Sequence, residues 1–248
     1  MIVETTLDWI CDIKLYQRKD GYRFSVDALL LYAFVNMKHV SHAVDLGTGS
    51  GVIGLLIAKK YPKATVLLVE LQESLYRLAA KNISLNSLED RVSLMNADIR
   101  DLRSILGPHT CDLVVSNPPF RKPATGRLST GEEKAIARHE LKINLPELAA
   151  SASHLLRGKG RFFMIFHPDR LLEVLDALRL HSLEPKRLRF VHNDAGSVSK
   201  IFMIEAVKDG KPGLKLDKPL FLYEQKGVDE KGNGGTYTEE VRKMYGDR

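Results

Sequence analysis

From residue 42 onward, the chain alternates short apolar runs with longer segments that have the period of an amphipathic helix. The apolar runs are 42–46, 65–70, 92–95, 112–116, 161–167 and 200–207, and the helical stretches between them include 52–61, 74–86, 145–157 and 170–181. Strands that alternate with helices need crossover connections, which place helices on both faces of a mostly parallel sheet. The pattern therefore predicts a doubly wound α/β fold.

The regions before and after this alternating core are expected to be additions to one globular domain. The expected parts are an N-terminal closing segment (1–41), the core (42–208) and a C-terminal extension (209–248). Ser25 is a candidate N-cap for a helix from Val26 to about Asn36. A turn at 209–213, a short strand at 219–223 and a last helix at 238–245 are expected after the core.

Composition sets limits on the class of protein. The hydrophobic share of 44% and charged share of 27% are ordinary for a soluble globular protein. No run approaches the ~18 apolar residues of a membrane span, and the first residues lack a signal-peptide pattern. Cys11 and Cys111 are far apart and have no metal-ligand spacing. We therefore expect no disulfide framework, no metal, no membrane contact and a cytoplasmic location.

A glycine-rich turn follows the first predicted strand, in the run Asp45-Leu46-Gly47-Thr48-Gly49-Ser50-Gly51. Glycine reaches positive φ and lets the backbone approach a ligand, so Gly47, Gly49 and Gly51 are candidate cofactor-binding residues. Residues 49–54 also match the G-x-G-x-x-G pattern of dinucleotide sites, which alone is a weak indication. The turn predicts a cofactor at the carboxyl end of this strand.

Asp45 favours one cofactor over another. A dinucleotide places its pyrophosphate at the helix N-terminus, where the amides and the dipole attract an anion. Asp45 would face that anion with a like charge. S-adenosylmethionine has no phosphate, and a carboxylate accommodates its sulfonium and ammonium cations. The aspartate therefore favours S-adenosylmethionine over NAD.

Two further carboxylates follow the next two predicted strands. Glu70 ends the second strand, where an acidic side chain can accept from both ribose hydroxyls. Asp98, which is followed by Ile99, comes after the third strand and can accept from an adenine amine. Acidic residues often end strands as cap or loop residues. Three of them at successive strand ends, beside a glycine turn, favour a cofactor site.

These residues resemble the first three motifs of class I S-adenosylmethionine-dependent methyltransferases, over roughly residues 42–207. The resemblance implies a Rossmann-like, mostly parallel sheet of seven strands. It also implies that S-adenosylmethionine is bound through Asp45, Gly47, Gly49, Gly51, Glu70, Asp98 and Ile99.

The fourth predicted strand ends in Asn117-Pro118-Pro119-Phe120. Asn-Pro-Pro can be a simple turn, but this one lies at the sheet edge where open α/β folds bind ligands. An exocyclic amine is a poor nucleophile, and two acceptors that hold its hydrogens favour attack and the developing positive charge. The Asn117 side chain and the Pro118 carbonyl can supply both acceptors. Pro119 fixes φ without donating an N–H, and Phe120 can stack on a base.

This run resembles the fourth motif of methyltransferases that act on adenine N6, guanine N2, cytosine N4 or glutamine side chains. Asn117 is a candidate for both the catalytic site and the cofactor site. Several family members have Tyr where this chain has Phe120. Stacking survives that difference, whereas a hydroxyl contact does not.

Residues 16–28 resemble the N-terminal signature of bacterial enzymes that methylate adenine N6 near the anticodon of a tRNA. In that family the element closes over the cofactor, which implicates Arg23, Phe24 and Asp27. Residues 121–140, 211–213, 219–220 and 237–246 fit the same family. The resemblance then covers nearly the whole chain and implies an RNA substrate, with tRNA expected. No feature indicates an obligate protein partner.

A long basic loop follows the reacting motif and is too long to be a plain connector. The net charge of +6 is suggestive of a polyanionic partner. The candidate RNA-binding residues of the loop are Arg121, Lys122, Arg127, Lys134 and Arg138. Three glutamates dilute this patch, so a solvated loop is the alternative. A second basic cluster, Lys186, Arg187 and Arg189, fits a solvated sheet edge equally well.

Four alternative functions stay open. A guanine-N2 methyltransferase of ribosomal RNA shares the acceptor chemistry. A protein glutamine-N5 methyltransferase usually carries a helical domain before the cofactor strand, whereas about forty residues precede Asp45 here. An NAD-dependent oxidoreductase is opposed by Asp45 and by the lack of an evident hydride-transfer set. A catalytically inactive binding protein is opposed by the intact Asn117 and Pro118.

Overall fold

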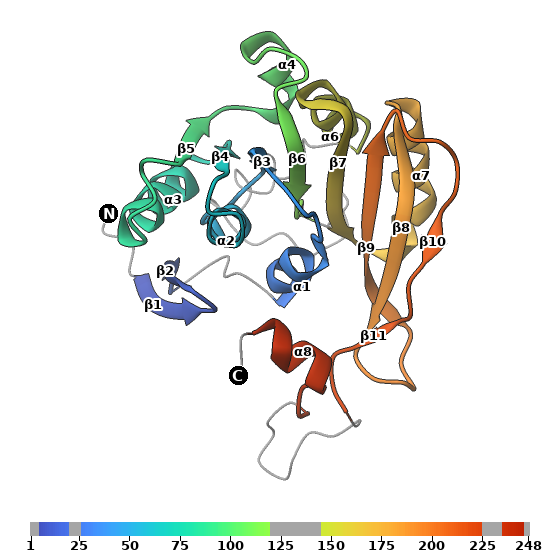
Figure 1. Ribbon diagram of the computed structural model, residues 1–248. Helices are drawn as coiled ribbons and strands as arrows, with labels where there is room; N and C mark the ends of the chain where they lie inside the picture. The colour runs from blue at the N-terminus through green and yellow to red at the C-terminus, as the bar shows by residue number, and fades with distance from the viewer. Residues whose placement is uncertain (1–4, 20–25, 120–144, 225–234, 246–248) are drawn as a thin grey trace, which may run out of the picture.

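The computed structural model describes residues 5–19, 26–119, 145–224 and 235–245 (Figure 1). The central sheet has the strand order β10-β8-β9-β7-β6-β3-β4-β5, and β11 pairs with β8. Its strands are β3 (His42–Leu46), β4 (Thr65–Glu70), β5 (Val92–Asn96), β6 (Cys111–Ser116), β7 (Leu156–Phe166), β8 (Leu183–His192), β9 (Ser199–Lys208), β10 (Lys215–Leu216) and β11 (Leu220–Phe221). Strand β9 runs antiparallel to β7 and β8, and the remaining pairs are parallel. Seven longer strands thus form the predicted doubly wound sheet, and the short β10 and β11 extend it.

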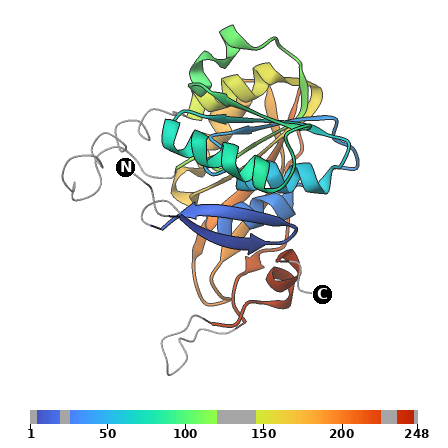
Figure 2. The same ribbon diagram turned by 90° about the vertical axis from the view of Figure 1, so that its left-hand side faces the viewer.

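Helices cover both faces of this sheet (Figures 1 and 2). One face carries α1 (Val26–Phe34), α2 (Val52–Lys60) and α3 (Glu73–Leu85); the other carries α4 (Leu102–Ile105), α6 (Leu145–Leu155) and α7 (Leu171–Leu180). Neighbouring residues of a strand point to opposite faces. Accordingly Val115 and Phe163 pack into one apolar core, whereas Val114 and Phe162 pack into the other. Burial on both faces explains why these strands appear in the sequence as continuous apolar runs.

A β-hairpin precedes α1, in a region where the sequence pattern predicts no strands. Strands β1 (Thr5–Ile10) and β2 (Ile13–Arg18) pair with each other in a separate two-stranded sheet. Ile10, Ile13 and Leu15 are buried in the same apolar core as α1 and α2. Figure 2 shows the hairpin alongside α3, outside the central sheet. The N-terminal segment is therefore attached to the core by apolar packing.

The C-terminal extension packs against the N-terminal half of the chain. Its helix α8 (Glu239–Met244) begins after Thr238, whose hydroxyl accepts from the Val241 amide. Val241 is fully buried in the core that contains α1, and the Cys11 thiol donates to the Met244 carbonyl. The two ends of the described chain are thus held together through α8.

Both cysteines are free, and burial raises the pKa of Cys111 to about 12.

Most predicted elements have the expected bounds to within two residues. Strand β7 is an exception, because it begins at Leu156, directly after α6, where the sequence pattern extends the helix to residue 157. The predicted strand at 219–223 is reduced to β11. The N-cap expected at Ser25 lies outside the described residues. In the described part of the chain, no helix has the length and apolarity of a membrane span.

Candidate cofactor and substrate site

The predicted glycine turn connects β3 to α2 at the carboxyl edge of the sheet. Gly47, Gly49 and Gly51 have φ values of 72°, 62° and 92°, which L side chains rarely adopt. Gly54 in the first turn of α2 allows a close approach for a different reason: a Cβ there would collide with the end of the buried Leu68 side chain. The glycines therefore fix both the path of the turn and the close approach of α2 to β4.

Asp45 is 1% exposed and lies directly under this turn. Its Oδ2 accepts from the Thr48 hydroxyl at 2.6 Å and from the Gly54 amide at 2.9 Å. Its Oδ1 is buried and has no hydrogen-bond partner among the described residues. Burial raises the pKa of Asp45 to about 6, although these two hydrogen bonds lower it. A buried carboxylate with one unpaired oxygen fits a cationic group, as the predicted cofactor requires.

The amides of the turn are already used within the protein. Gly47 and Thr48 both donate to the Val69 carbonyl, at 2.9 and 3.0 Å. The Gly49 amide donates to Glu70 Oε2 at 2.8 Å. A pyrophosphate needs such amides as donors at the start of the helix. This turn therefore suits a cofactor without phosphate better than it suits a dinucleotide.

Glu70 ends β4, as predicted, and is 5% exposed. Its two carboxylate oxygens accept from the amides of Gly49 and Gln72, each at 2.8 Å. A carboxylate offers about four acceptor positions, so these bonds are compatible with the predicted acceptance from ribose hydroxyls. The Asn96 side chain donates to the carbonyls of Glu70 and Leu71, which holds the ends of β4 and β5 together.

Asp98 and Ile99 lie after β5, where Asp98 is the N-cap and Ile99 the first residue of a one-turn helix, η1 (Ile99–Asp101). Asp98 accepts from the Arg100 amide at 3.0 Å and forms an ion pair with the Arg100 guanidinium at 2.6 Å. Acceptance from an adenine amine therefore requires Asp98 to share its oxygens with Arg100. Ile99 is buried, and its carbonyl accepts from the Ser151 hydroxyl of α6 at 2.8 Å. The Ile99 side chain lies against the glycine turn, because a Cβ placed on Gly47 would be 3.9 Å from Ile99 Cδ1.

Asn117 follows β6 at the same edge of the sheet. The preceding residue, Ser116, is fully buried, and its hydroxyl donates to the Leu46 carbonyl at the end of β3 at 2.8 Å. Asn117 is half-buried, Pro118 is buried and Pro119 is exposed. No described residue forms a hydrogen bond with the Asn117 side chain. An Asn with a purely structural role at a turn normally bonds to nearby backbone through its side chain. The Asn117 side chain makes no such bond, as expected for a residue whose oxygen accepts from a ligand.

Several predicted site residues lie outside the described part of the chain. They are Arg23, Phe24, Phe120, Arg121, Lys122, Arg127, Lys134 and Arg138. Asp27 is described and occupies the first turn of α1. Of the catalytic candidates, Asn117, Pro118 and Pro119 are described, and they follow β6 at the carboxyl edge of the sheet.

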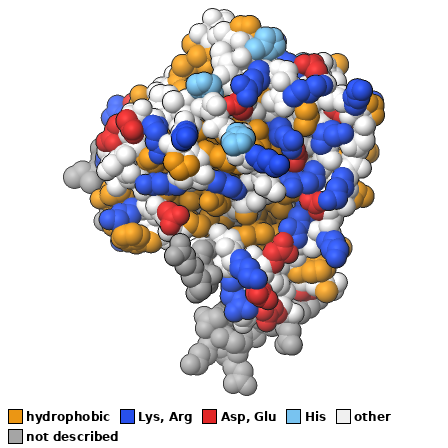
Figure 3. Space-filling view, in the orientation of Figure 1, with side chains coloured by type: hydrophobic (Ala, Val, Ile, Leu, Met, Phe, Trp, Pro, Cys, Tyr) orange, Lys and Arg blue, Asp and Glu red, His pale blue; other side chains and the backbone are white. Residues whose placement is uncertain are grey.

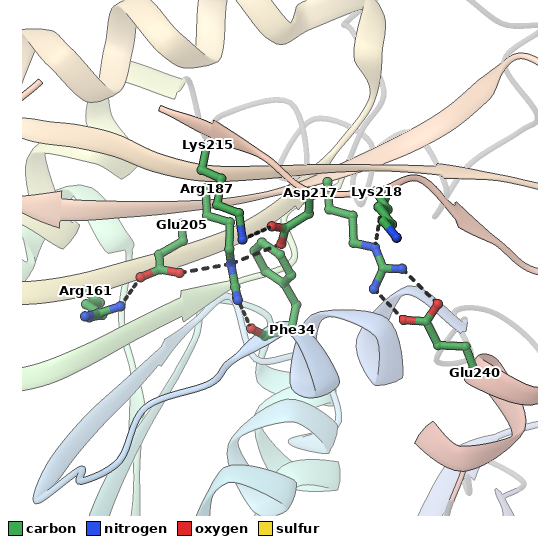
Figure 4. A network of polar contacts seen from close by, with 9 residues as sticks. Phe34, Arg161, Arg187, Glu205, Lys215, Asp217, Lys218 and Glu240 are labelled. Carbon is green, nitrogen blue, oxygen red and sulfur yellow. Dashed lines mark hydrogen bonds and ion pairs between the residues drawn. The ribbon is translucent and has the colours of Figure 1, made fainter. Parts of the chain in front are cut away.

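The second basic cluster is engaged within the protein (Figure 4). Arg187 bonds to the Phe34 carbonyl at the end of α1, and its Nε lies 3.2 Å from Glu205 Oε2. Arg189 forms two bonds with the Glu240 carboxylate, at 2.7 and 2.9 Å. These arginines connect β8 to α1, β9 and α8. Figure 3 shows Asp and Glu side chains among the Lys and Arg side chains of this face, which argues against a single RNA patch here.

The sequence reasoning missed four polar residues that organise the site: Thr48, Asn82, Asn96 and Ser116. Asn82 of α3 is fully buried, and its Nδ2 donates to the Ser50 carbonyl in the turn at 2.8 Å and to the Tyr16 carbonyl at 3.0 Å. Asn86, the residue that directly follows α3, bonds to Lys14 in the same strand, β2. Two asparagines four residues apart in a predicted helix, where Asn is disfavoured, are the signal that could have indicated this contact.

A profile of the methyltransferase small domain family matches residues 25–171. The chain belongs to this family. The predicted class of enzyme, a methyltransferase, and its predicted cofactor, S-adenosylmethionine, are thereby confirmed. In the part of the chain that the structure describes, no cluster of three or more His, Cys, Asp or Glu side chains could hold a metal ion.

Two relatives carry methyltransferase names, and one solved structure shares the fold. A protein of Porphyromonas gingivalis named tRNA1(Val) (adenine(37)-N6)-methyltransferase is 34% identical over 158 residues, which are 61% of this methyltransferase and 61% of the relative. The chain thus aligns with less than two thirds of that relative's length. A protein of the same name from Dyadobacter fermentans is 24% identical over 86% of this chain and 87% of its own. The crystal structure of a predicted O-methyltransferase from Agrobacterium tumefaciens has a TM-score of 0.70 at 20% identity, over 89% of this chain and 95% of its own.

Proposed function

We propose that this methyltransferase transfers the methyl group of S-adenosylmethionine to the exocyclic N6 amine of an adenine in RNA. The proposed RNA is a tRNA, modified near the anticodon, and the proposed location is the cytoplasm. The names of the relatives from Porphyromonas gingivalis and Dyadobacter fermentans support this substrate. The observation that carries the chemistry is the Asn117 side chain, which is half-buried beside the cofactor turn and forms no hydrogen bond with a described residue.

The proposed roles at the reacting end follow from the chemistry of an aromatic amine. When bound, S-adenosylmethionine supplies an electrophilic methyl group. The Asn117 side-chain oxygen and the Pro118 carbonyl accept the two amine hydrogens, and both bonds strengthen as the nitrogen becomes positively charged. The proton leaves an already cationic amine, so a strong general base is not required. Phe120 holds the base by stacking.

The proposed roles at the cofactor end follow from charge and burial. Asp45 faces the cationic part of the cofactor with a buried carboxylate, and Glu70 accepts from the ribose hydroxyls. Asp98 accepts from the adenine amine, while Ile99 and the turn at Gly47, Gly49 and Gly51 give the cofactor a close-fitting wall. Arg23, Phe24 and Asp27 close the site from the N-terminal side. Arg121, Lys122, Arg127, Lys134 and Arg138 hold RNA phosphates.

Nucleoside analysis tests this proposal directly. The purified enzyme is incubated with isotopically labelled S-adenosylmethionine and total RNA from a strain that lacks its gene, and the digested nucleosides are analysed by mass spectrometry. We expect labelled N6-methyladenosine in the tRNA fraction. Labelled N2-methylguanosine in ribosomal RNA, or labelled methylglutamine in added release factors, would contradict the proposal and support the corresponding alternative.

A further inference from the structure

The β1–β2 hairpin has one buried face and one exposed face. Ile10, Ile13 and Leu15 are buried in the core, so the alternate residues of both strands point outward. The outer face is formed by Leu7, Trp9, Lys14, Tyr16 and Arg18, in which Leu7 pairs with Tyr16 and Trp9 pairs with Lys14. Trp9 is 71% exposed and Leu7 48% exposed. Two large apolar side chains thus lie in solvent on a short, well-paired ribbon.

The outer face carries positive charge that no described residue neutralises through an ion pair. Lys14 Nζ lies 4.5 Å from the centre of the Trp9 ring. Neither Lys14 nor Arg18 forms an ion pair with a described residue, and Arg18 Nε is buried with no hydrogen-bond partner. Asp8 belongs to the opposite face, where it accepts from the Gln17 side chain. The described residues of the outer face therefore combine aromatic and cationic side chains and include no carboxylate.

We propose that this outer face is a second docking surface for the RNA substrate, which binds a segment away from the target nucleotide. A base stacks on Trp9, and Lys14 and Arg18 contact the neighbouring phosphates. Interleaved aromatic and basic side chains bind nucleic-acid strands in this way, because every base has a face for stacking and every nucleotide carries a negative charge. Charge complementarity favours RNA over a second copy of this chain, whose net charge is +6. The inference rests on the proposed RNA substrate.

The hairpin is fixed relative to the cofactor turn, as a docking surface requires. The Asn82 side chain accepts from the Tyr16 amide at 2.7 Å and donates to the Tyr16 carbonyl at 3.0 Å, and it also donates to the Ser50 carbonyl in the turn. Asn86 makes the same pair of bonds with Lys14, at 2.9 and 2.7 Å. RNA bound along β2 is therefore held at a set distance from the cofactor.

Trp9 is the only tryptophan in the chain, so the intrinsic fluorescence of the unaltered enzyme reports on this face alone. The enzyme is titrated with an unmodified tRNA transcript, with acrylamide as a neutral quencher. We expect a saturable change in Trp9 emission and at least a threefold decrease in the acrylamide quenching constant, at the RNA concentration that saturates binding measured by anisotropy. Unchanged emission and quenching at saturating RNA would overturn the inference. Protection of Trp9 without RNA in a dimer seen by sedimentation would also overturn it.

Variants separate this surface from the reacting site. Trp9→Ala should weaken tRNA binding about fivefold or more, whereas Trp9→Phe should keep most of the affinity. Lys14→Ala should weaken binding and reduce the salt slope by ~1. Leu172→Ala is the matched control, because this apolar residue of α7 is 76% exposed and α7 lies far from the hairpin (Figure 1). Cofactor affinity and the melting temperature should not change in any of these variants.

The test distinguishes two kinds of failure. If the unaltered enzyme neither binds nor methylates RNA, both the proposed function and this docking surface are wrong. If it methylates tRNA and the KM for tRNA is the same in Trp9→Ala and Lys14→Ala as in the unaltered enzyme, the proposed function stands and the docking surface alone is wrong.

Discussion

Asp45 and Gly54 are joined by a hydrogen bond of 2.9 Å from the backbone amide at the start of α2 to Oδ2 of the buried carboxylate. Burial raises the pKa of this carboxyl to about 6, from an ordinary value of 3.8. The folded, cofactor-free protein therefore keeps the Asp45 proton up to about pH 6, whereas the unfolded chain releases it near pH 3.8. The protonated Asp45 carboxyl therefore stabilises the folded protein fully below about pH 3.8. This stabilisation is lost as the pH rises from 3.8 through about 6.

The first prediction is a loss of stability with rising pH that depends on Asp45. Relative to Asp45→Asn, the unaltered protein should lose about 2 kcal/mol of unfolding free energy between pH 4 and 7. Denaturant unfolding of both proteins over this pH range measures the difference. A cationic cofactor favours the ionised carboxyl, so binding at pH 5.5 should also release a proton, seen by calorimetry in buffers of different ionisation enthalpy. A pH-independent difference between the two proteins would contradict the prediction.

The second prediction concerns the close contact of α2 with β4. A methyl group at Gly54 would collide with Leu68 Cδ2 and lie 3.3 Å from Asp45 Oδ2. Gly54→Ala should therefore cost about 1–3 kcal/mol of unfolding free energy through overpacking. Gly107→Ala is the control, because its nearest contact is 4.0 Å away. Adding Leu68→Ala to Gly54→Ala removes the side chain that the new methyl group meets, so the double variant should regain part of the room lost between α2 and β4. A Gly54→Ala protein as stable as Gly107→Ala would show that this contact is wrong.

The third prediction separates two neighbouring asparagines. Asn82 bonds to Ser50 in the cofactor turn and to Tyr16, whereas Asn86 bonds to Lys14 and not to the turn. Asn82→Ala leaves buried backbone groups without partners, so it should cost about 1–3 kcal/mol and weaken cofactor binding. Asn86→Ala should loosen the hairpin but leave cofactor affinity unchanged. Denaturant unfolding and calorimetry with S-adenosylhomocysteine compare the two; equal losses of cofactor affinity would refute the separate roles.

The fourth prediction concerns the loop that follows the reacting motif. Replacing Arg121, Lys122 and Arg127 together by Ala should weaken RNA binding and flatten its salt dependence, because fewer counterions are released. Cofactor affinity should stay the same. Binding of a tRNA transcript at several salt concentrations measures the slope. An unchanged slope in the triple variant would mean that this loop does not dock the RNA.

The sequence predicts the core strands better than the edges of the fold. Strands such as β3 and β6 are buried on both sides and appear as short, mostly apolar runs. Strand β8 was missed, because a register shift between Pro185 and Arg187 breaks its alternation. The hairpin was missed because Leu7 and Trp9 place apolar residues on its exposed face as well, which hides the period of two.

The candidate site likewise contains residues whose positions can be predicted from the sequence and residues whose positions cannot. The positions of Asp45, Glu70 and Asn117 at the carboxyl edge of the sheet could be predicted, since each lies at or beside the end of a strand that is itself visible in the sequence. The role of Asn82 could not, because its partners Tyr16 and Ser50 lie 66 and 32 residues away along the chain. Such contacts depend on how α3 packs against the hairpin, which no local pattern encodes.

The single-turnover rate of Asn117→Ala tests the proposed chemistry most directly. Its acceptor bond is stronger in the transition state than in the ground state, so its loss should lower the methyl-transfer rate about 10²–10³-fold. Cofactor affinity and melting temperature should change little. Asn117→Asp keeps an acceptor and adds a negative charge beside the cationic nitrogen, so it should retain more activity than the Ala variant. An Asn117→Ala protein that melts early but keeps its rate per folded molecule would show that Asn117 is structural and that the mechanism is wrong.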